Sequence, residues 1–251
     1  MGEELFEELR GARRIAVLTG AGISTDSGIP DYRGPDGVWT KDPAAADLFG
    51  IKNYLADTQV RRQFWQRYVD HAAWRAEPNA AHTALAGLND AGLAVRVLTQ
   101  NIDGLHQRAG LPARKVLELH GSMHSTVCTR CAATTPTPET LARVTGGEAD
   151  PACRACGGIL KLAVVLFGQH LDGDVLGHAR NIAAASEVFL AIGSSLQVEP
   201  AASLCALAVT AGAKLVIVNR DPTPYDDQAT HLVREPISAV IPRICEVLQE
   251  S

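Results

Sequence analysis

The chain has 251 residues, of which 46% are hydrophobic and 20% are charged, and its formal net charge is −5. This composition excludes a disordered tail and predicts a globular protein with one sizeable core and a small subdomain. It also argues against a general binder of nucleic-acid backbones, because the 23 basic residues are scattered rather than gathered in a stripe, so no direct nucleic-acid partner is expected.

No apolar run is long enough to span a bilayer, and the acidic, amphipathic stretch MGEELFEELRGARR does not have the pattern of a secretion signal. We therefore expect no membrane partner and a cytoplasmic location. In that compartment the six cysteines are expected to be thiols or metal ligands rather than disulfides.

Short apolar runs alternate with helix-like segments along the chain. The runs cover residues 15–19, 95–99, 116–119, 164–167, 188–192 and 215–218. Helices are predicted over residues 83–89, from about residue 200, and over residues 236–248. Strands that are hydrophobic throughout are buried on both faces, as in parallel sheets. The predicted fold class is therefore α/β, a doubly wound, Rossmann-like parallel sheet.

Two stretches interrupt this alternation. Residues 36–78 include Val60, Phe64, Trp65 and Tyr68 at roughly helical spacing, which indicates an inserted helical element. Residues 122–160 hold four of the cysteines. We expect the two insertions to form a smaller lobe, and residues 1–35, 79–121 and 161–251 to form a large Rossmann-like domain.

The four clustered cysteines have the spacing of a structural zinc site. Cys128 and Cys131 form one Cys-x-x-Cys knuckle, and Cys153 and Cys156 form a second. Two such knuckles bring four thiolates to the corners of a tetrahedron and leave no coordination position open for chemistry. A redox dithiol would explain one knuckle but not the matched second one.

The first apolar run ends in a turn that suits a phosphate. Gly20, Ala21 and Gly22 follow it, as in dinucleotide-binding turns. The usual fingerprint continues into a full helix, but residues 28–35, GIPDYRGP, cannot be a helix interior because proline and glycine break it. The chain therefore places a polar loop where a dehydrogenase would continue its helix.

Polar side chains follow the next apolar run as well. Gln100, Asn101, Asp103 and His106 come directly after residues 95–99. Ligands of open parallel sheets lie beyond the carboxyl ends of the strands, so these side chains are expected to face the same crevice as the glycine turn. Amide and carboxylate side chains can form hydrogen bonds with a carboxamide and a ribose. Taken alone, Asn101 and Asp103 could instead simply close a turn.

Three further apolar runs end in the same way. His120 ends one of them, and its imidazole can accept a proton near neutral pH. Gly193, Ser194 and Ser195 follow another, and Asn219 follows a third. Because the same edge of the sheet is used every time, the five strand ends together predict a bound dinucleotide.

These residues resemble the sirtuin (Sir2) family. The match runs from about residue 13 to residue 243 and includes the stretches GAGIS, GIPDYR, TQNIDGLH, LHG and GSSL, together with the four cysteines. The resemblance implies an NAD-dependent protein-lysine deacylase that produces nicotinamide, O-acyl-ADP-ribose and free lysine, with NAD and one structural zinc as cofactors and an acyl-lysine protein or peptide as partner. DYRGPDGVWT and SLQVEP look most like the branch of chromatin-associated mammalian sirtuins, in a compact, bacterial-type form.

The resemblance also implies roles for individual residues. His120, Asn101 and Asp103 are the expected catalytic residues. The expected cofactor contacts are Gly20, Ala21, Gly22, Ser24, Ile29, Asp31, Tyr32, Arg33, Gln100, Asn101, Ile102, Asp103, Gly193, Ser194, Ser195, Asn219, Arg220 and Asp221. The peptide is expected to pair between residues 165–169 and 196–199, with contacts from Val165, Leu166, Phe167, Gly168, Leu196, Gln197 and Val198.

Some positions depart from the family pattern. Tyr32 stands where a phenylalanine is usual, Ser194 where a threonine is usual, and Gln169 where many relatives have glutamate. The helix QFWQRYVDH lacks the Tyr-x-x-Arg pair of sirtuins that prefer succinyl-lysine, so neutral acyl groups are expected.

Three alternatives remain at this point. A mono-ADP-ribosyltransferase would share the NAD site. A dehydrogenase is expected to have an acidic residue after its second strand and to lack a zinc lobe. A zinc-ribbon module that binds nucleic acid would leave the polar strand ends unexplained.

Overall fold

The computed structural model describes residues 3–35, 37–42 and 48–250. Its largest element is a six-stranded sheet with the order β3-β2-β1-β7-β8-β9, in which every neighbouring pair is parallel. The strands are β1 (Arg14–Thr19), β2 (Ala94–Thr99), β3 (Val116–Glu118), β7 (Val188–Ile192), β8 (Lys214–Val218) and β9 (His231–Val233). The predicted α/β class is confirmed.

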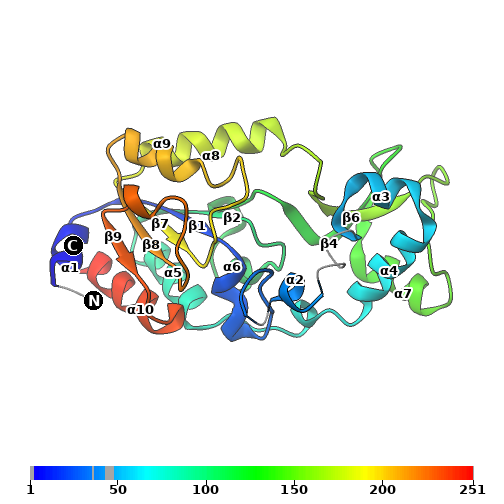
Figure 1. Cartoon of the computed structure of the whole chain (residues 1–251), viewed down its shortest axis with the longest axis horizontal. Helices are drawn as coiled ribbons and strands as arrows, with labels where there is room; N and C mark the ends of the chain where they lie inside the picture. Colours follow the sequence, from blue (N-terminus) through cyan, green and yellow to red (C-terminus); the bar gives the residue numbers. More distant parts are fainter. Residues whose placement is uncertain (1–2, 36, 43–47, 251) are drawn as a thin grey trace.

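Helices cover both faces of this sheet (Figure 1). One face packs against α1 (Glu3–Leu9), α5 (Ala80–Asp90) and α10 (Ile237–Gln249), and the other against α8 (Gly173–Ala185) and α9 (Leu204–Thr210). Successive residues of β1 alternate between the two cores, with Ile15 and Val17 in one and Ala16 and Leu18 in the other. Burial on both faces is why these strands are hydrophobic throughout.

A second sheet corrects one strand assignment. The apolar run at residues 164–167 predicts a strand of the parallel sheet, but the strand β6 (Leu160–Val164) belongs to an antiparallel sheet with the order β5-β4-β6. Its partners are β4 (Gly121–Cys128) and β5 (Thr134–Pro136). An apolar run indicates burial but not the direction of its neighbour, which is why the sequence suggests the wrong sheet.

The two insertions share one hydrophobic core. Tyr54 on α3 (Ile51–Ala56) and Phe64, Trp65 and Tyr68 on α4 (Thr58–Val69) pack with residues of β4, β6 and α7 (Thr137–Thr145). The helical element expected in the first insertion is therefore present. The domain boundaries themselves stay a prediction, and residues 36 and 43–47 of the first insertion lie outside the described residues.

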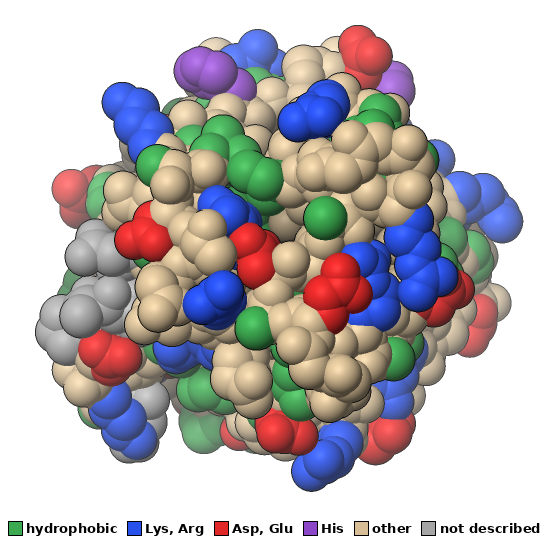
Figure 2. All heavy atoms as spheres, turned by 90° about the vertical axis from the view of Figure 1, so that its right-hand side faces the viewer, with side chains coloured by type: hydrophobic (Ala, Val, Ile, Leu, Met, Phe, Trp, Pro, Cys, Tyr) green, Lys and Arg blue, Asp and Glu red, His purple; other side chains and the backbone are tan. Residues whose placement is uncertain are grey.

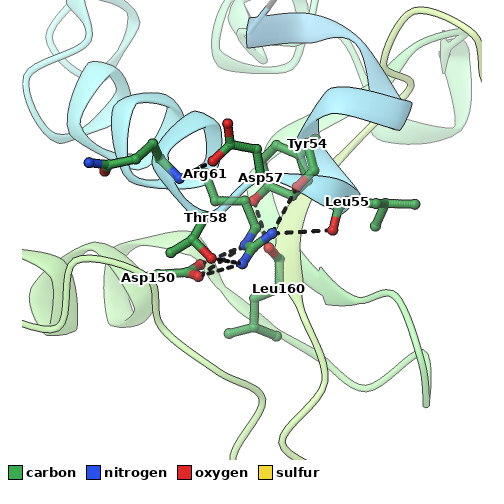
Figure 3. Close-up of polar contacts among 8 residues, drawn as sticks. Tyr54, Leu55, Asp57, Thr58, Arg61, Asp150 and Leu160 are labelled. Carbon is green, nitrogen blue, oxygen red and sulfur yellow. Dashed lines mark hydrogen bonds and ion pairs between the residues drawn. The ribbon is translucent and has the colours of Figure 1, made fainter.

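An ion pair ties the insertions together (Figure 3). The guanidinium of Arg61, on α4, donates to both carboxylate oxygens of Asp150 at 2.8–3.0 Å. It also donates to the carbonyls of Tyr54 and Leu55 at the end of α3. The Tyr54 hydroxyl donates to the Leu160 carbonyl at 2.6 Å.

The remaining described elements are short or connect these layers. They are α2 (Val38–Lys41), α6 (Leu105–Arg108), and the 3-10 turns η1 (Ala21–Ser27), η3 (Ala72–Trp74), η4 (Ala113–Lys115) and η5 (Asp226–Gln228). Within the described ranges, no helix is both long and apolar enough to cross a bilayer.

Candidate functional site

The glycine turn lies directly against the start of the segment after β7. The Gly22 amide donates to the Gly193 carbonyl at 2.8 Å, and a Cβ on Gly20 would lie 2.7 Å from that oxygen. Gly193 itself has a φ of +62°, and a Cβ there would lie 2.4 Å from the Ile23 nitrogen. Two strand ends can approach this closely only because these positions are glycine.

The chain after the turn is a short 3-10 turn, η1, rather than a long helix. It ends at Gly28, whose φ is +85°, and the polar loop 28–35 follows. The sequence prediction that the helix stops here is confirmed. Within that loop, the Asp31 carboxylate accepts the Gly34 amide at 2.8 Å, which closes a turn.

A buried polar cluster lies beside the glycine turn, on residues 100–103. The Ser24 hydroxyl donates to Asp103 Oδ2 at 2.8 Å. The Asn101 side-chain amide donates to the Gly20 carbonyl at 3.1 Å and contacts the Ser24 hydroxyl at 3.2 Å. All three side chains are buried, so their groups are held in fixed positions.

His106 lies beneath this cluster rather than in the crevice. It is 2% exposed, and its Nε2 lies 3.0 Å from the Thr19 hydroxyl, which in turn donates to Thr99. Burial, reinforced by the neighbouring His82, lowers the pKa of His106 to about 3. The expectation that His106 faces the crevice is therefore wrong, because its imidazole is buried against Thr19.

His120 has a fixed orientation. Its Nδ1 lies 3.0 Å from the Gln100 carbonyl oxygen. Because a carbonyl only accepts, Nδ1 must carry the proton in the neutral ring, which leaves Nε2 as the basic nitrogen. Burial holds the pKa of His120 below its ordinary value, so the neutral form dominates at neutral pH.

A cavity opens between the polar cluster and the helical insertion. Its lining includes Ala21, Ser24, Ile29, Tyr32, Arg67, Tyr68, His71, Gln100, Asn101, Ile102, Asp103 and Met123. Burial, and to a lesser degree the Asp103 carboxylate, raises the pKa of Tyr32, so its phenol stays protonated. The sequence indicates Tyr68 only as a core residue and gives no sign of Arg67 or His71, because helical spacing does not reveal which residues of α4, or of the chain just after it, reach a cavity.

Three aromatic rings lie together beside this cavity. The Trp39 ring lies 4.8 Å from that of Tyr32 and 5.3 Å from that of Phe167, measured between centroids. The Arg33 guanidinium lies 4.6 Å from the centroid of the Trp39 ring. Phe167 is 47% exposed, which leaves an apolar ring available to a ligand.

The end of β7 also lies at this crevice. The Gln100 side-chain amide donates to the Ser194 hydroxyl at 2.8 Å, which joins the ends of β2 and β7. Leu196, two residues further on, has a φ of +52°, which is unusual for a side chain with a Cβ. Ser195 is half-buried, and Gln197 and Val198 follow as the chain leaves the sheet.

Asn219 lies at the end of β8 and is held by local contacts. Its side-chain amide donates to the Asp221 carbonyl at 2.8 Å, and Arg234 donates to the carbonyls of both residues. Arg220 and Asp221 form an exposed ion pair at 2.9 Å. This strand end is thus rigid and lies on the same edge of the sheet as the other four.

Most backbone groups of residues 165–167 already have partners. The Val165 amide donates to the His120 carbonyl at 2.9 Å. Phe167 pairs with Phe49 and Ile51 at 2.8 and 2.9 Å, and the Leu166 amide donates to the Gln169 side chain at 2.9 Å. Gly168, with a φ of +85°, then turns the chain.

The four clustered cysteines converge as expected. Their sulfur atoms all lie within 4.8 Å of one another, with Cys128 and Cys156 at 3.5 Å and Cys131 and Cys153 at 3.8 Å. A tetrahedral zinc with Zn–S bonds of about 2.3 Å would place its sulfurs about 3.8 Å apart, so this cluster could bind a structural zinc. Cys205 and Cys245 are buried thiols, and burial raises the pKa of each to about 12.

Comparisons with known proteins agree with this geometry. Residues 20–200 match the model of the Sir2 family. The "NAD-dependent protein deacetylase 2" of Streptomyces coelicolor is 55% identical over 94% of this chain and 98% of its own length. The "NAD-dependent protein deacetylase" of Sulfolobus acidocaldarius is 45% identical over 98% and 95%.

Solved structures are similar over nearly the whole chain. One described as "Sir2-p53 peptide-NAD+" has a TM-score of 0.87 at 36% identity and covers 100% of both chains. Another, "Structure of Sir2Tm bound to a propionylated peptide", has a TM-score of 0.85 at 35% identity and covers 97% of each. The glycine turn, the polar strand ends, the cysteine cluster and these matches confirm the resemblance seen in the sequence: this chain belongs to the Sir2 family.

Proposed function

We propose that the protein is an NAD-dependent protein-lysine deacylase that releases nicotinamide and yields O-acyl-ADP-ribose and free lysine. The observation that carries this function is the position of His120, which has a basic Nε2 fixed by the Gln100 carbonyl. Its backbone also holds Val165 at the start of the expected peptide-binding segment. One histidine thus joins the cofactor crevice to the substrate segment.

NAD binds across the strand ends. The backbone at Gly20, Ala21 and Gly22, with Arg33, Ser194 and Ser195, holds the phosphates, since closely approaching amides and a cation suit such groups. Ser24, Ile29, Asp31, Tyr32, Gln100 and Ile102 surround the nicotinamide half, whose carboxamide faces Asn101 and Asp103. Gly193 lets the end of β7 approach the glycine turn, and Asn219, Arg220 and Asp221 bind the adenosine end.

When bound, NAD would supply a ribose carbon to take up the acyl oxygen, with nicotinamide as the leaving group, and one water would be consumed as the lysine amine is released from the acyl carbon. Nε2 of His120 would accept the proton of the ribose hydroxyl that attacks the acyl carbon. Proton transfer of this kind contributes about 10²–10⁴-fold, and the fixed orientation of the groups contributes more. Cys128, Cys131, Cys153 and Cys156 would hold a zinc ion, whose role would be structural because four thiolates leave no coordination position for chemistry.

The substrate is an acyl-lysine in an extended peptide. An apolar slot at Val165 and Phe167 favours the neutral acylated side chain, because burial of a free ammonium costs several kcal/mol. Since the Leu166 and Phe167 backbones and the Gln169 amide are already bonded, we place the peptide against Gly168 and the Gln169 carbonyl on one side and Leu196, Gln197 and Val198 on the other.

Two alternatives are less well supported. A mono-ADP-ribosyltransferase would use the same crevice, but the relatives are named as deacetylases and the similar structures include one with a propionylated peptide. A nucleic-acid module would need a basic surface, whereas basic and acidic side chains are interspersed over the small-lobe face in Figure 2. We also propose a cytoplasmic location, which the six free cysteines favour.

The test is an acetyl-lysine peptide incubated with NAD and followed by mass spectrometry. The wild-type enzyme is expected to release nicotinamide and to form deacetylated peptide and O-acetyl-ADP-ribose in equal amounts. His120→Tyr is expected to lose turnover while it keeps its zinc and its fold. Wild-type turnover by His120→Tyr would overturn the role of this base, and ADP-ribose attached to protein would favour the transferase.

A further inference from the structure

Lys161 carries a buried ammonium group. It is 8% exposed, and among the described residues no carboxylate lies within ion-pair distance of its ammonium. Arg61, which is equally buried, is paired with Asp150. Burial lowers the pKa of Lys161 to about 8. Burial of an ammonium group costs free energy unless it is hydrogen-bonded, so the contacts of Lys161 Nζ indicate its role.

The ammonium binds two backbone carbonyls of its own strand. Nζ donates to the Leu162 carbonyl at 2.9 Å and to the Val164 carbonyl at 2.5 Å. β6 is the edge strand of its sheet, and alternate residues present their carbonyls to the open edge. The preceding carbonyl on that edge, of Leu160, accepts the Tyr54 hydroxyl. Tyr54 and Lys161 therefore satisfy three successive edge carbonyls.

The last of these carbonyls is next to the proposed substrate segment. Val164 is followed by Val165, whose amide donates to the His120 carbonyl. Two residues further, the Phe167 backbone pairs with Phe49 and Ile51. The orientation of the peptide plane after Val164 therefore determines where the segment starts relative to His120.

We infer that Lys161 is a positioning residue for acyl-lysine binding: its ammonium holds the Leu162 and Val164 carbonyls and so fixes Val165–Gly168 against His120. This inference rests on the proposed deacylase function. Lys161 binds backbone carbonyls of its own strand and is not among the expected substrate contacts, so its removal is expected to weaken the binding of acyl peptide more than it slows the chemical step.

The test compares Lys161→Met, which keeps the length and removes the donors, with Lys161→Arg, which keeps two donors in a planar fork. The matched control is Lys214→Met, because Lys214 also donates to a backbone carbonyl, that of Glu8, at the opposite end of the molecule. Steady-state kinetics give KM for acetyl-lysine peptide and for NAD, and zinc content and thermal unfolding report on the fold.

For Lys161→Met we expect the KM for the peptide to rise about tenfold, which corresponds to the free energy of a buried carbonyl that loses its hydrogen-bond donor. We expect kcat and the KM for NAD to stay within about threefold of wild type. Lys161→Arg is expected to recover most of the peptide KM, and Lys214→Met to leave it unchanged. If Lys161→Met does not fold, the same comparison is made with Lys161→Gln.

An unchanged peptide KM in folded Lys161→Met, or in Lys161→Gln where it takes its place, would overturn the inference, as would an equal rise in the KM for NAD. A peptide KM raised as much in Lys214→Met would also do so, because it would show a general loss of stability. Failure of the proposed deacylase function is distinguishable from failure of this inference, because in the first case the wild-type enzyme would form no deacylated product.

Discussion

The contact between Arg61 and Asp150 yields the most quantitative prediction for stability. Arg61→Met removes every hydrogen bond to the Asp150 carboxylate drawn in Figure 3 and leaves the carbonyls of Tyr54 and Leu55 without that donor. Loss of one partner of a buried pair costs about 3–5 kcal/mol. Because the Asp150 side chain is 21% exposed, water can reach it, and we expect the lower end, about 3 kcal/mol.

The assay is urea unfolding followed by tryptophan fluorescence. The three tryptophans, Trp39, Trp65 and Trp74, all lie in the helical insertion, so the signal reports on the part of the molecule that the ion pair stabilises. The matched control is Arg62→Met, because Arg62 is the exposed neighbour on the same helix. A change within about 0.5 kcal/mol is expected there.

The double variant Arg61→Met, Asp150→Leu separates the pair from its surroundings. Replacing both charges with apolar groups removes the unpaired carboxylate but does not restore the donor to the Tyr54 and Leu55 carbonyls, so the double variant is expected to regain part of the lost stability. The reasoning is refuted if Arg61→Met costs no more than Arg62→Met, or if the double variant is less stable than the single one.

Three further results follow from the site. Because burial holds the pKa of His120 below its ordinary value of 6.5, kcat/KM should rise with pH on an acidic limb centred below 6.5 and be flat near neutrality; a limb centred above 6.5 would contradict this. Gly193→Ala should weaken NAD binding by about tenfold or more in calorimetry, because its Cβ meets the Ile23 nitrogen at a positive φ. Gly212→Ala, also at a positive φ but with open space around it, should bind NAD normally. Chelation should unfold the small lobe, because structural zinc contributes about 10–16 kcal/mol; unchanged tryptophan fluorescence after metal removal would refute that role.

The parallel sheet is predictable because its strands are buried on both faces. The five expected strands β1, β2, β3, β7 and β8 all lie within it. β9 escapes prediction because it has three residues at the edge, one of them buried. The sequence assigns β6 the wrong partners because β4 reads GSMHSTVC, a mixed polar sequence that does not look like a strand on its own.

The carboxyl ends of the parallel strands predict much of the site from the sequence. They place Asn101 and Asp103 beside the glycine turn, where both lie. The same reasoning fails for His106 because a position one turn into a helix can point either toward a ligand or beneath it. Arg61 and Asp150 are 89 residues apart, and Lys161 binds its own backbone, so no local pattern could reveal either contact.

The central claim is that cofactor and acyl-lysine meet under His120 at the edge of the parallel sheet. A crystal structure of the protein with NAD and an acetyl-lysine peptide tests it most directly. We predict the dinucleotide across Gly20, Asn101 and Gly193, with Nε2 of His120 facing the ribose and the acyl-lysine beside Phe167. A dinucleotide bound anywhere else, or an acyl-lysine that does not reach His120, would contradict the account.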